Sequence, residues 1–206
     1  MAVEDAVVAI IGAAGSVGSA CSKILASEVK KIILIDKRKD ELEDLVDTIK
    51  KGCRGSWEHY YDLPEFIKAD FIITVASATE GILKPFHIDR GTIIIDTAQP
   101  PNVSYDVINR DDVVVINSGI AYLKGINLNM NIGLNKEEIY ACLGEVLILL
   151  WRGWEGNYNL GKVNPEQVKE LLEWAPRVGL SVARFRNCAG LVEDNSFEKI
   201  KKIKKK

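Results

Sequence analysis

The strongest constraint on the fold is a glycine-rich turn near the amino terminus, with the sequence Gly12-Ala-Ala-Gly15-Ser-Val-Gly18. Residues 6–11 before it form a continuous apolar run rich in β-branched side chains, which is typical of a strand buried in a parallel sheet. Within residues 16–26, apolar side chains recur at helical spacing, and a second apolar run follows at 32–35. The pattern predicts a strand, a helix and a second strand, with glycines at the first junction.

The glycines of the turn have distinct roles in such a unit. Gly12 permits a tight turn at the strand exit, Gly15 lets the backbone approach a diphosphate, and Gly18 lets the helix pack on the strand. The helix start offers unpaired N–H groups and a partial positive charge to the phosphates. We therefore expect a dinucleotide to bind here. The expected contacts of the turn are Gly12, Ala14, Gly15, Ser16, Val17 and Gly18.

Asp36 ends the second predicted strand and bears on the choice of cofactor. A carboxylate at this position accepts hydrogen bonds from the adenosine ribose hydroxyls and repels a 2′-phosphate, which favours NAD. Lys37, Arg38 and Lys39 follow directly, and a cationic group among them could accommodate the 2′-phosphate of NADP if Asp36 turned away. The sequence favours NAD and leaves NADP open.

The alternation of strands and helices continues through the first half of the chain. Residues 39–51 form an amphipathic helix pattern that Gly52 is placed to end. Buried strands are predicted at residues 71–75, 92–95 and 113–116, with a weak strand at 57–60 and a short helix at 64–67. This order predicts an α/β fold with a doubly wound, mostly parallel sheet, the Rossmann NAD(P)-binding fold, followed by C-terminal helices.

Loops at the carboxyl ends of the later strands are expected to line the rest of the cofactor groove, because ligands of such sheets bind at that edge. Small and hydroxyl-bearing side chains there let a flat ligand approach and offer hydrogen bonds. The residues expected in these loops are Ala76, Ser77, Thr97, Asn117 and Gly119.

The last third of the chain is predicted to be helical. Asn135, with Glu138 three residues later, is typical of an N-cap and predicts a helix that runs to about Trp151. Its expected apolar face comprises Ile139, Leu143, Val146 and Leu150. Asn164 caps a second predicted helix, 165–175. We expect one domain over residues 1–195, in which the helices from about 135 complete the core or form a small lobe, and a basic tail at 196–206 that forms a frayed or mobile helix.

Composition narrows the function classes. The 206 residues are 47% hydrophobic and carry a formal net charge of -2, so no global charge favours nucleic acid. No apolar run approaches the roughly 20 residues that a membrane span needs, and no secretion signal is visible. The four cysteines lie far apart and away from the histidines, so we expect neither a metal site nor disulfides, and a cytoplasmic protein.

Several motifs between about residues 7 and 182 resemble one family of reductases. They are the glycine turn, Val75-Ala-Ser77, Asp96 with Pro100, Asn117-Ser-Gly119-Ile, Met130-Asn131 and Ile139-Tyr-Ala-Cys142-Leu-Gly-Glu145. The chain resembles the long-chain acyl-[acyl-carrier-protein] reductases and the related predicted amino-acid dehydrogenases, which are similar to the nucleotide domain of shikimate dehydrogenases. The resemblance implies an NAD(P)-dependent oxidoreductase that reduces an acyl thioester to an aldehyde.

The resemblance also implies a catalytic cysteine. In the acyl reductases, a cysteine of the matching helix takes the acyl group as a thioester, and the matching residue here is Cys142. A thiolate is a strong nucleophile, and a thioester is electrophilic enough to accept hydride. On the predicted helix, Cys142 lies about two turns in, beyond the part where the dipole stabilises a thiolate, so a buried core cysteine is the alternative. His87 is the better placed of the two histidines for a catalytic base.

Two other functions stay open. The chain could oxidise an amino acid or a related small substrate without covalent catalysis, or it could be a dinucleotide-binding subunit that needs a separate substrate-binding chain. The acyl reductases carry a sizeable region ahead of the glycine turn, whereas the first strand here begins a few residues from Met1. The substrate is therefore expected to be smaller, to be delivered by a partner, or to bind at residues 135–195. A homo-oligomer is also possible.

Overall fold

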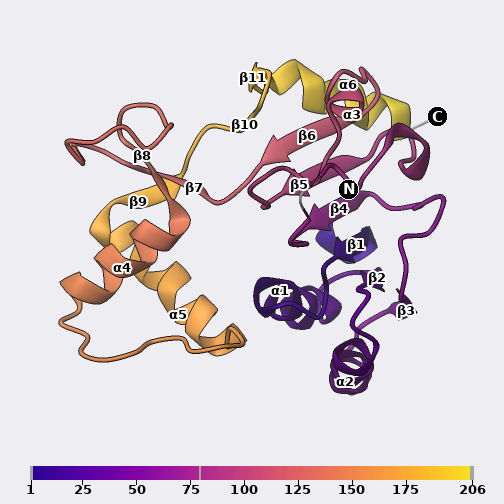
Figure 1. The fold of residues 1–206 in the computed structure, drawn as a ribbon, viewed down its shortest axis with the longest axis horizontal. Helices are drawn as coiled ribbons and strands as arrows, with labels where there is room; N and C mark the ends of the chain where they lie inside the picture. The colour runs from indigo at the N-terminus through magenta and orange to yellow at the C-terminus, as the bar shows by residue number, and fades with distance from the viewer. Residues whose placement is uncertain (1, 79, 205–206) are drawn as a thin grey trace. The chain divides into compact units, whose positions relative to one another are not determined.

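The computed structural model of the chain describes residues 2–78 and 80–204. These residues form two compact units (Figure 1), with unit 1 comprising Met1–Asn117 and Phe185–Lys206 and unit 2 comprising Ser118–Arg184. The sequence left open whether the segment from about 135 completes the core or forms a lobe. In the structure, unit 2 begins earlier, at Ser118, and the chain returns to unit 1 at Phe185.

Unit 1 is built on a mostly parallel sheet. Among the described residues its strand order is β11-β10-β6-β5-β4-β1-β2-β3, with the two short strands β10 and β11 antiparallel. The strands are β1 (Val7–Ile11), β2 (Lys31–Ile35), β3 (Ser56–Tyr60), β4 (Phe71–Thr74), β5 (Ile93–Asp96), β6 (Val114–Asn117), β10 (Arg186–Asn187) and β11 (Gly190–Leu191). From β1 the chain adds β2 and β3 on one side and then crosses over to add β4, β5 and β6 on the other side. This reversal beside β1 confirms the expected doubly wound α/β sheet of the Rossmann type.

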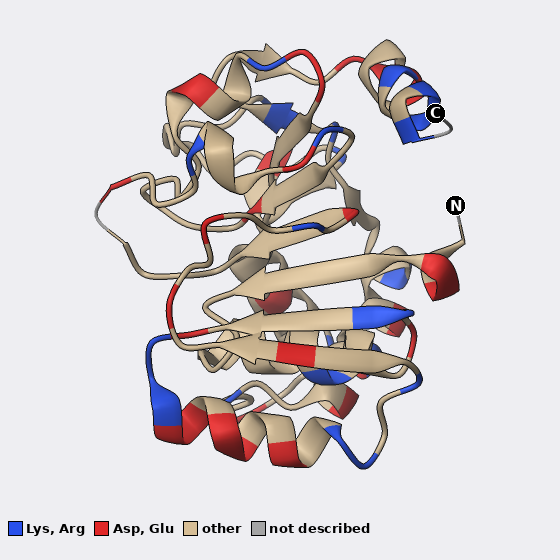
Figure 2. Cartoon of the chain, turned by 90° about the vertical axis from the view of Figure 1, so that its right-hand side faces the viewer, with Lys and Arg blue, Asp and Glu red and all other residues tan. Residues whose placement is uncertain are grey.

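The parallel strands lie where the apolar runs predicted them, and even the weakly patterned β3 is confirmed. Two buried clusters, one on each face of the sheet, explain why these runs are apolar throughout. Ile10 and Ile72, for example, are completely buried on neighbouring strands. In Figure 2 the strands are almost entirely free of charged residues, whereas the neighbouring helix α2 carries both signs.

Helices cover the sheet of unit 1. They are η1 (Val3–Asp5), α1 (Ser16–Ala26), α2 (Lys39–Ile49), η2 (Pro85–His87), α3 (Tyr105–Ile108) and α6 (Asp194–Lys204). The α2 helix buries the four apolar residues that its sequence pattern predicts, Leu42, Leu45, Val46 and Ile49.

Two expectations for unit 1 are wrong. Residues 64–67 form no helix, because the Ile67 N–H donates to the His87 carbonyl, 2.7 Å away, and Ile67 bridges to Ile88. The lysine-rich end is helical as expected, but up to Lys204 it is not frayed, because α6 buries Ile200 against Val114 and Ile116 of β6. Apolar residues three positions apart let this highly charged segment pack on the sheet.

Unit 2 contains a small antiparallel sheet and two helices. Among the described residues its strand order is β8-β7-β9. The elements are β7 (Ile120–Leu123), β8 (Glu138–Tyr140), α4 (Ala141–Trp151), α5 (Pro165–Trp174), η3 (Ala175–Val178) and β9 (Leu180–Val182). The α5 helix begins as predicted, with the Asn164 side chain accepting a hydrogen bond from the Glu166 N–H at 3.0 Å. None of the helices of the described residues is long and apolar enough to cross a membrane.

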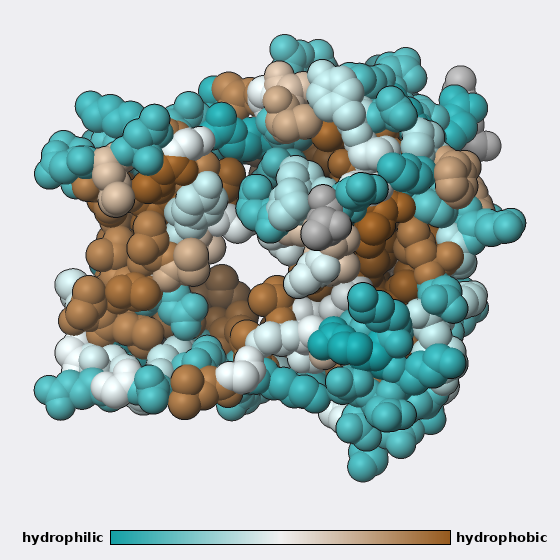
Figure 3. Space-filling model, viewed as in Figure 1, coloured by the Kyte–Doolittle hydropathy of each residue, from teal (hydrophilic) through white to brown (hydrophobic). Residues whose placement is uncertain are grey.

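The helix predicted from Asn135 begins five residues late, with Tyr140 rather than Asn135 as its N-cap. Glu138 reaches back to the Asn135 N–H, at 3.0 Å, as in a capping box, but Glu137 has a left-handed φ of 66° and the chain turns into strand β8 instead. The expected apolar face is also wrong, because Ile148 is buried whereas Val146 and Leu150 are exposed. In Figure 3, hydrophobic surface gathers over the part of the chain that Figure 1 labels α4 and β9.

Candidate functional site

Two neighbouring cavities lie in unit 1 where its parallel strands end. The first, of about 460 Å³, is lined mainly by the ends of β1 and β2 and by residues 61–63, and the second, of about 520 Å³, by the start of α1 and residues 97–100. Both include residues 75–78, which follow β4. Ligands of open α/β sheets bind at this edge, beside the strand where the order reverses. The two cavities together form the candidate site.

Two glycines of the turn leave no room for a Cβ, and the third leaves little. Gly12 has a φ of 88°, and a Cβ there would lie 2.8 Å from the Ala76 backbone nitrogen. At Gly18 a Cβ would lie 2.1 Å from the Gly12 carbonyl oxygen, so α1 could not pack as it does. At Gly15 a Cβ would meet the Gly12 carbonyl oxygen at 3.2 Å and the Arg38 guanidinium at 3.5 Å. The turn is a bare backbone cradle, which fits a dinucleotide diphosphate.

The start of α1 has the electrostatics that an anion requires. Its N-cap is Gly15, which supplies no side-chain cap, and the first turn contains no acidic residue. The first helical residues, Ser16 and Val17, are exposed and line the second cavity. N–H groups at a helix start that no capping side chain covers point their partial positive charge outward, so this end of α1 can hold phosphate oxygens.

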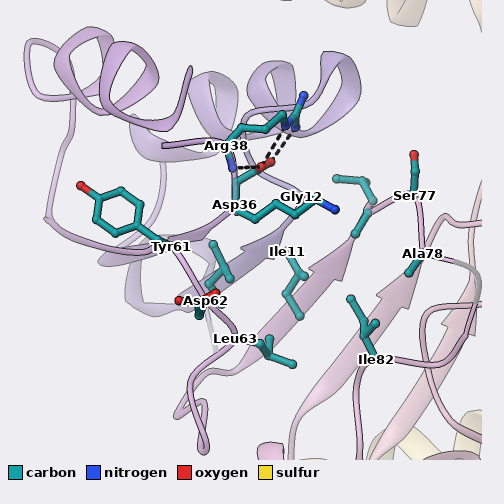
Figure 4. A pocket seen from close by; sticks show the side chains of 14 residues that line it. Ile11, Gly12, Asp36, Arg38, Tyr61, Asp62, Leu63, Ser77, Ala78 and Ile82 are labelled. Carbon is teal, nitrogen blue, oxygen red and sulfur yellow. Dashed lines mark hydrogen bonds and ion pairs between the residues drawn. The ribbon is translucent and has the colours of Figure 1, made fainter. Parts of the chain in front are cut away.

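Asp36 lies at the end of β2 and connects the turn to Arg38 (Figure 4). Its Oδ2 accepts hydrogen bonds from the Ala14 N–H at 2.9 Å and from Arg38 Nη2 at 2.7 Å. Its Oδ1 accepts from the Arg38 N–H and from Arg38 Nε, both at 3.0 Å. The Asp36 side chain is 4% exposed, whereas that of Arg38 is 44% exposed. A buried carboxylate is thus neutralised by a guanidinium that still faces solvent.

The ionisation of Asp36 follows from these contacts. Burial alone would raise its pKa, but the hydrogen bonds from Arg38 and from the Ala14 N–H together hold the pKa below its usual value. The same contact raises the pKa of Arg38. Asp36 is therefore a carboxylate and Arg38 a cation throughout the physiological range.

The structure brings most of the predicted cofactor residues together. Residues that line the first cavity are Gly12, Asp36, Lys37, Arg38, Ala76 and Ser77, and those that line the second are Ser16, Val17, Ala76, Ser77 and Thr97. Asn117 and Gly119 line neither cavity. Asn117 ends β6, where it pairs with Arg186, and Gly119 follows the boundary to unit 2.

His87 lies away from both cavities. Its Nδ1 accepts a hydrogen bond from the Lys84 N–H at 2.9 Å, and its carbonyl binds Ile67, in the segment that leads into β4. Burial, with a smaller effect of the Lys84 charge, lowers the pKa of His87. The histidine is thus neutral and supports the η2 turn, so in unit 1 it is not positioned to act on a ligand of the two cavities.

Cys142 belongs to unit 2 and is exposed. Because α4 begins at Ala141, Cys142 is the second residue of this helix, and the expectation that it lies two turns in is wrong. The first turn is the part of a helix where the dipole stabilises negative charge. Its exposure also removes the alternative of a buried core cysteine. Among the described residues no cluster of His, Cys, Asp or Glu could hold a metal ion.

Sequence reasoning missed several lining residues. Those that lie farthest along the sequence from the glycine turn complete the lining of the first cavity together with Arg38 (Figure 4). They are Tyr61, Asp62, Leu63 and Ile82. Tyr61 follows the edge strand β3, whose pattern was weak, and its hydroxyl donates to Glu43 of α2. The weak strand predicted at 57–60 was the available signal, because parallel neighbours end together and a residue after that strand lies at the carboxyl edge beside Asp36.

A family model described as Shikimate / quinate 5-dehydrogenase matches residues 1–119, which contain the glycine turn and every residue that lines the two cavities.

Curated relatives match most of this chain with parts of their own. The aminotransferase PigE of a Serratia species is 26% identical over 87% of this chain and 22% of that protein. The long-chain acyl-[acyl-carrier-protein] reductase of Synechococcus elongatus is 27% identical over 86% of this chain and 53% of that protein. The glutamyl-tRNA reductase of Campylobacter curvus is 29% identical over 54% of this chain and 26% of that protein. The chain spans about half, or less, of the length of these relatives.

Proposed function

Since this chain belongs to the shikimate/quinate 5-dehydrogenase family, we propose that it binds a nicotinamide dinucleotide across the two cavities and reduces an acyl thioester to an aldehyde. The family consists of oxidoreductases with an NAD(P)-binding domain, and reductases are among the relatives of this chain. The acyl substrate, the role of Cys142 and the choice between NAD and NADP are the specific parts of the proposal.

One observation carries the dinucleotide part: two cavities flank residues 75–78 beside a glycine turn whose backbone a Cβ would obstruct. A dinucleotide has two ring systems joined by a diphosphate, so it needs two hollows and an anion cradle between them. The turn and the start of α1 would hold the diphosphate. The first cavity, with Asp36 and Arg38, would take the adenosine half, and the second, with Thr97, the nicotinamide half.

Cys142 is proposed as the nucleophile that accepts the acyl group. It is exposed in the first turn of α4, and a relative of 27% identity is an acyl-[acyl-carrier-protein] reductase. Attack of the Cys142 thiolate on a thioester carbonyl forms a new C–S bond and breaks the C–S bond to the carrier. The carrier leaves as a thiolate and takes up the proton that the Cys142 thiol has lost. The acyl group leaves as an aldehyde when it accepts a hydride, and the Cys142 thiolate is then regenerated. A bound, reduced nicotinamide would supply this hydride.

Intact-mass spectrometry tests the acyl step. Palmitoyl-coenzyme A, added without dinucleotide, should increase the mass of the protein by one palmitoyl group, and hydroxylamine should remove the label because it cleaves thioesters. Cys142→Ser should abolish the labelling. Cys188→Ser is the matched control, because Cys188 is also exposed but lies in unit 1, and it should label like the wild type.

The acyl step would be refuted by labelling that survives Cys142→Ser or disappears in Cys188→Ser. Dinucleotide binding with reduction of a small substrate by Cys142→Ser would instead favour a dehydrogenase that uses no covalent catalysis. Dinucleotide binding without turnover on any thioester, restored by a second protein, would favour a subunit that depends on a partner.

The contacts of Asp36 support NADP as the cofactor. A carboxylate has about four acceptor positions, and in the described structure Ala14 and Arg38 occupy them with the four hydrogen bonds given above. The argument for NAD requires a carboxylate with free positions for ribose hydroxyls. The Arg38 guanidinium, by contrast, has further N–H groups and is nearly half exposed. We therefore propose that Arg38 binds the 2′-phosphate of NADP.

A further inference from the structure

The loop that follows β5 forms one wall of the second cavity, and a buried carboxylate shapes it. Asp96 is 3% exposed. Its Oδ2 accepts hydrogen bonds from the N–H groups of Asn102 at 2.9 Å and Val103 at 3.1 Å. Its Oδ1 accepts from the Ala98 N–H at 3.1 Å and lies 3.4 Å from the Thr74 hydroxyl. One side chain thus bends residues 97–103 back onto the end of its own strand.

Asn102 connects this loop to the opposite wall. Its side chain is completely buried, and its Nδ2 donates to the Thr74 hydroxyl at 2.6 Å and to the Ala76 carbonyl at 2.8 Å. Ala76 belongs to residues 75–78, which line both cavities. A second connection runs from Thr97, whose N–H and hydroxyl both donate to the Thr74 carbonyl, at 3.0 and 2.9 Å. The two walls of the second cavity are therefore joined behind its surface.

This polar cluster is a poor way to stabilise a core. The described contacts of Asp96 include no cation, and burial raises its pKa despite the N–H groups that oppose the shift. The amide oxygen of Asn102 is buried without a donor among the described residues. Each of these features costs folding free energy. What a carboxylate and an amide provide, and apolar side chains cannot, is a set of directed bonds that fix two loops at one separation.

We propose that Asp96 and Asn102 are positioning residues, which hold residues 97–100 against residues 75–78 so that the second cavity has the width of the nicotinamide half before a dinucleotide arrives. Neither side chain lines the cavity, so both act through the residues they hold. The inference rests on the proposed function, because it assigns the second cavity to the nicotinamide half.

Titration calorimetry with two ligands separates this role from a general structural one. NADP contains both halves, whereas 2′-phospho-ADP-ribose lacks the nicotinamide ring. Asn102→Ala should weaken NADP binding about tenfold, which is the effect of losing roughly one well-placed hydrogen bond. The affinity for the fragment should stay within about twofold of the wild-type value. Asp96→Asn, which keeps the shape of the side chain but loses acceptors, should likewise weaken NADP binding and leave binding of the fragment nearly unchanged.

Thr92→Val is the matched control. Its hydroxyl is also completely buried and donates to a backbone carbonyl, that of Ala69, at 2.8 Å, but it lies before β5, at the other end of that strand. The control should bind both ligands like the wild type. Equal weakening of NADP and the fragment by Asn102→Ala, or no weakening, would overturn the positioning role and leave the proposed function standing. Wild-type protein that binds neither ligand would refute the proposed function itself.

A measurement on wild-type protein decides the matter even if a variant does not fold. The N–H groups of Ala98, Asn102 and Val103 donate to Asp96, so their hydrogen exchange reports whether the wall exists without a ligand. We expect exchange at least about 100-fold slower than in an unstructured peptide, and little further slowing when NADP is added. Fast exchange that becomes slow only with NADP would show a wall formed by the ligand, and would overturn the proposal.

Discussion

Asp36 and Asp96 end two strands of one sheet, and the comparison of their surroundings shows two uses of a buried carboxylate. Both are buried, and each lies within reach of hydrogen-bond donors on the loop that follows its strand. Asp36 forms an ion pair with Arg38, and the pKa of Asp36 is lowered despite burial. Asp96 has N–H groups and a hydroxyl as its described partners, and burial raises its pKa.

This difference indicates which part of the site, the surroundings of Asp36 or those of Asp96, can respond to a ligand. Asp36 has two backbone N–H partners, but its other partner is the exposed guanidinium of Arg38, and an incoming phosphate can bind that cation without any change in the backbone. The partners of Asp96 are mostly backbone N–H groups, which cannot leave without unfolding the loop. We therefore expect the Asp36 end to discriminate between cofactors and the Asp96 end to be rigid.

The largest expected effect is a difference in stability between two alanine variants. Asp96→Ala leaves two buried N–H groups, of Asn102 and Val103, and the part-buried one of Ala98 without their acceptor, and should lower the free energy of unfolding by about 3 kcal/mol. Asp36→Ala should cost less, about 2 kcal/mol, because the Ala14 N–H alone is left buried without its acceptor and water can solvate the released Arg38 side chain. Urea unfolding measures both values. Equal losses of unfolding free energy in the two variants would contradict the view that Asp96 fixes its loop whereas the Asp36–Arg38 ion pair can be replaced.

A second, smaller effect concerns cofactor choice. Arg38→Ala should weaken NADP binding by about tenfold or more, the value of a charge-assisted contact, and change NAD binding by less than about threefold. Arg54→Ala is the control, since Arg54 is also an exposed arginine paired with a carboxylate, Glu4, but does not line either cavity. Calorimetric titrations that show the same loss for NADP and NAD would contradict a 2′-phosphate contact.

The smallest expected effect is a pair of opposite pH dependences. The lowered pKa of Asp36 contributes stability above the unfolded value of about 3.9, and this is lost as the pH falls towards the folded pKa. The raised pKa of Asp96 contributes stability below that value, and this is lost as the pH rises through the folded pKa. Unfolding of the wild type against Asp36→Asn and against Asp96→Asn should give differences with opposite pH slopes. Slopes of one sign would show that both carboxylates have similar surroundings.

The fold of unit 1 could be predicted from the sequence because local signals and global architecture agree there. Apolar runs such as 7–11 and 32–35 predict buried parallel strands, and the glycine turn predicts how the first strand joins α1. Unit 2 could not be predicted equally well. Asn135 and Glu138 do form the contact of a capping box, but the left-handed Glu137 places it on a turn before β8, and no pattern in the sequence reports that backbone angle.

The candidate site was predictable where it depends on backbone and not where it depends on long-range contacts. The glycines and Asp36 are at fixed distances along one strand–helix–strand unit, so spacing alone locates them. The Asn102 side chain, in contrast, donates a hydrogen bond to the carbonyl of Ala76, 26 residues away in the sequence, and no local pattern predicts that contact. The hydrogen bonds from the Arg38 side chain to Asp36 depend on side-chain geometry, which explains why the sequence favoured NAD whereas we propose NADP.

The most direct test of the account is a map of amide chemical shifts in 15N-labelled wild-type protein on addition of NADP. We predict shifts at residues 12–17, at 75–78 and at 97–99, because these segments form the turn and the walls of the two cavities. Absence of shifts at saturating NADP, or shifts confined to residues 125–138 around the separate cavity of unit 2, would contradict dinucleotide binding at the glycine turn.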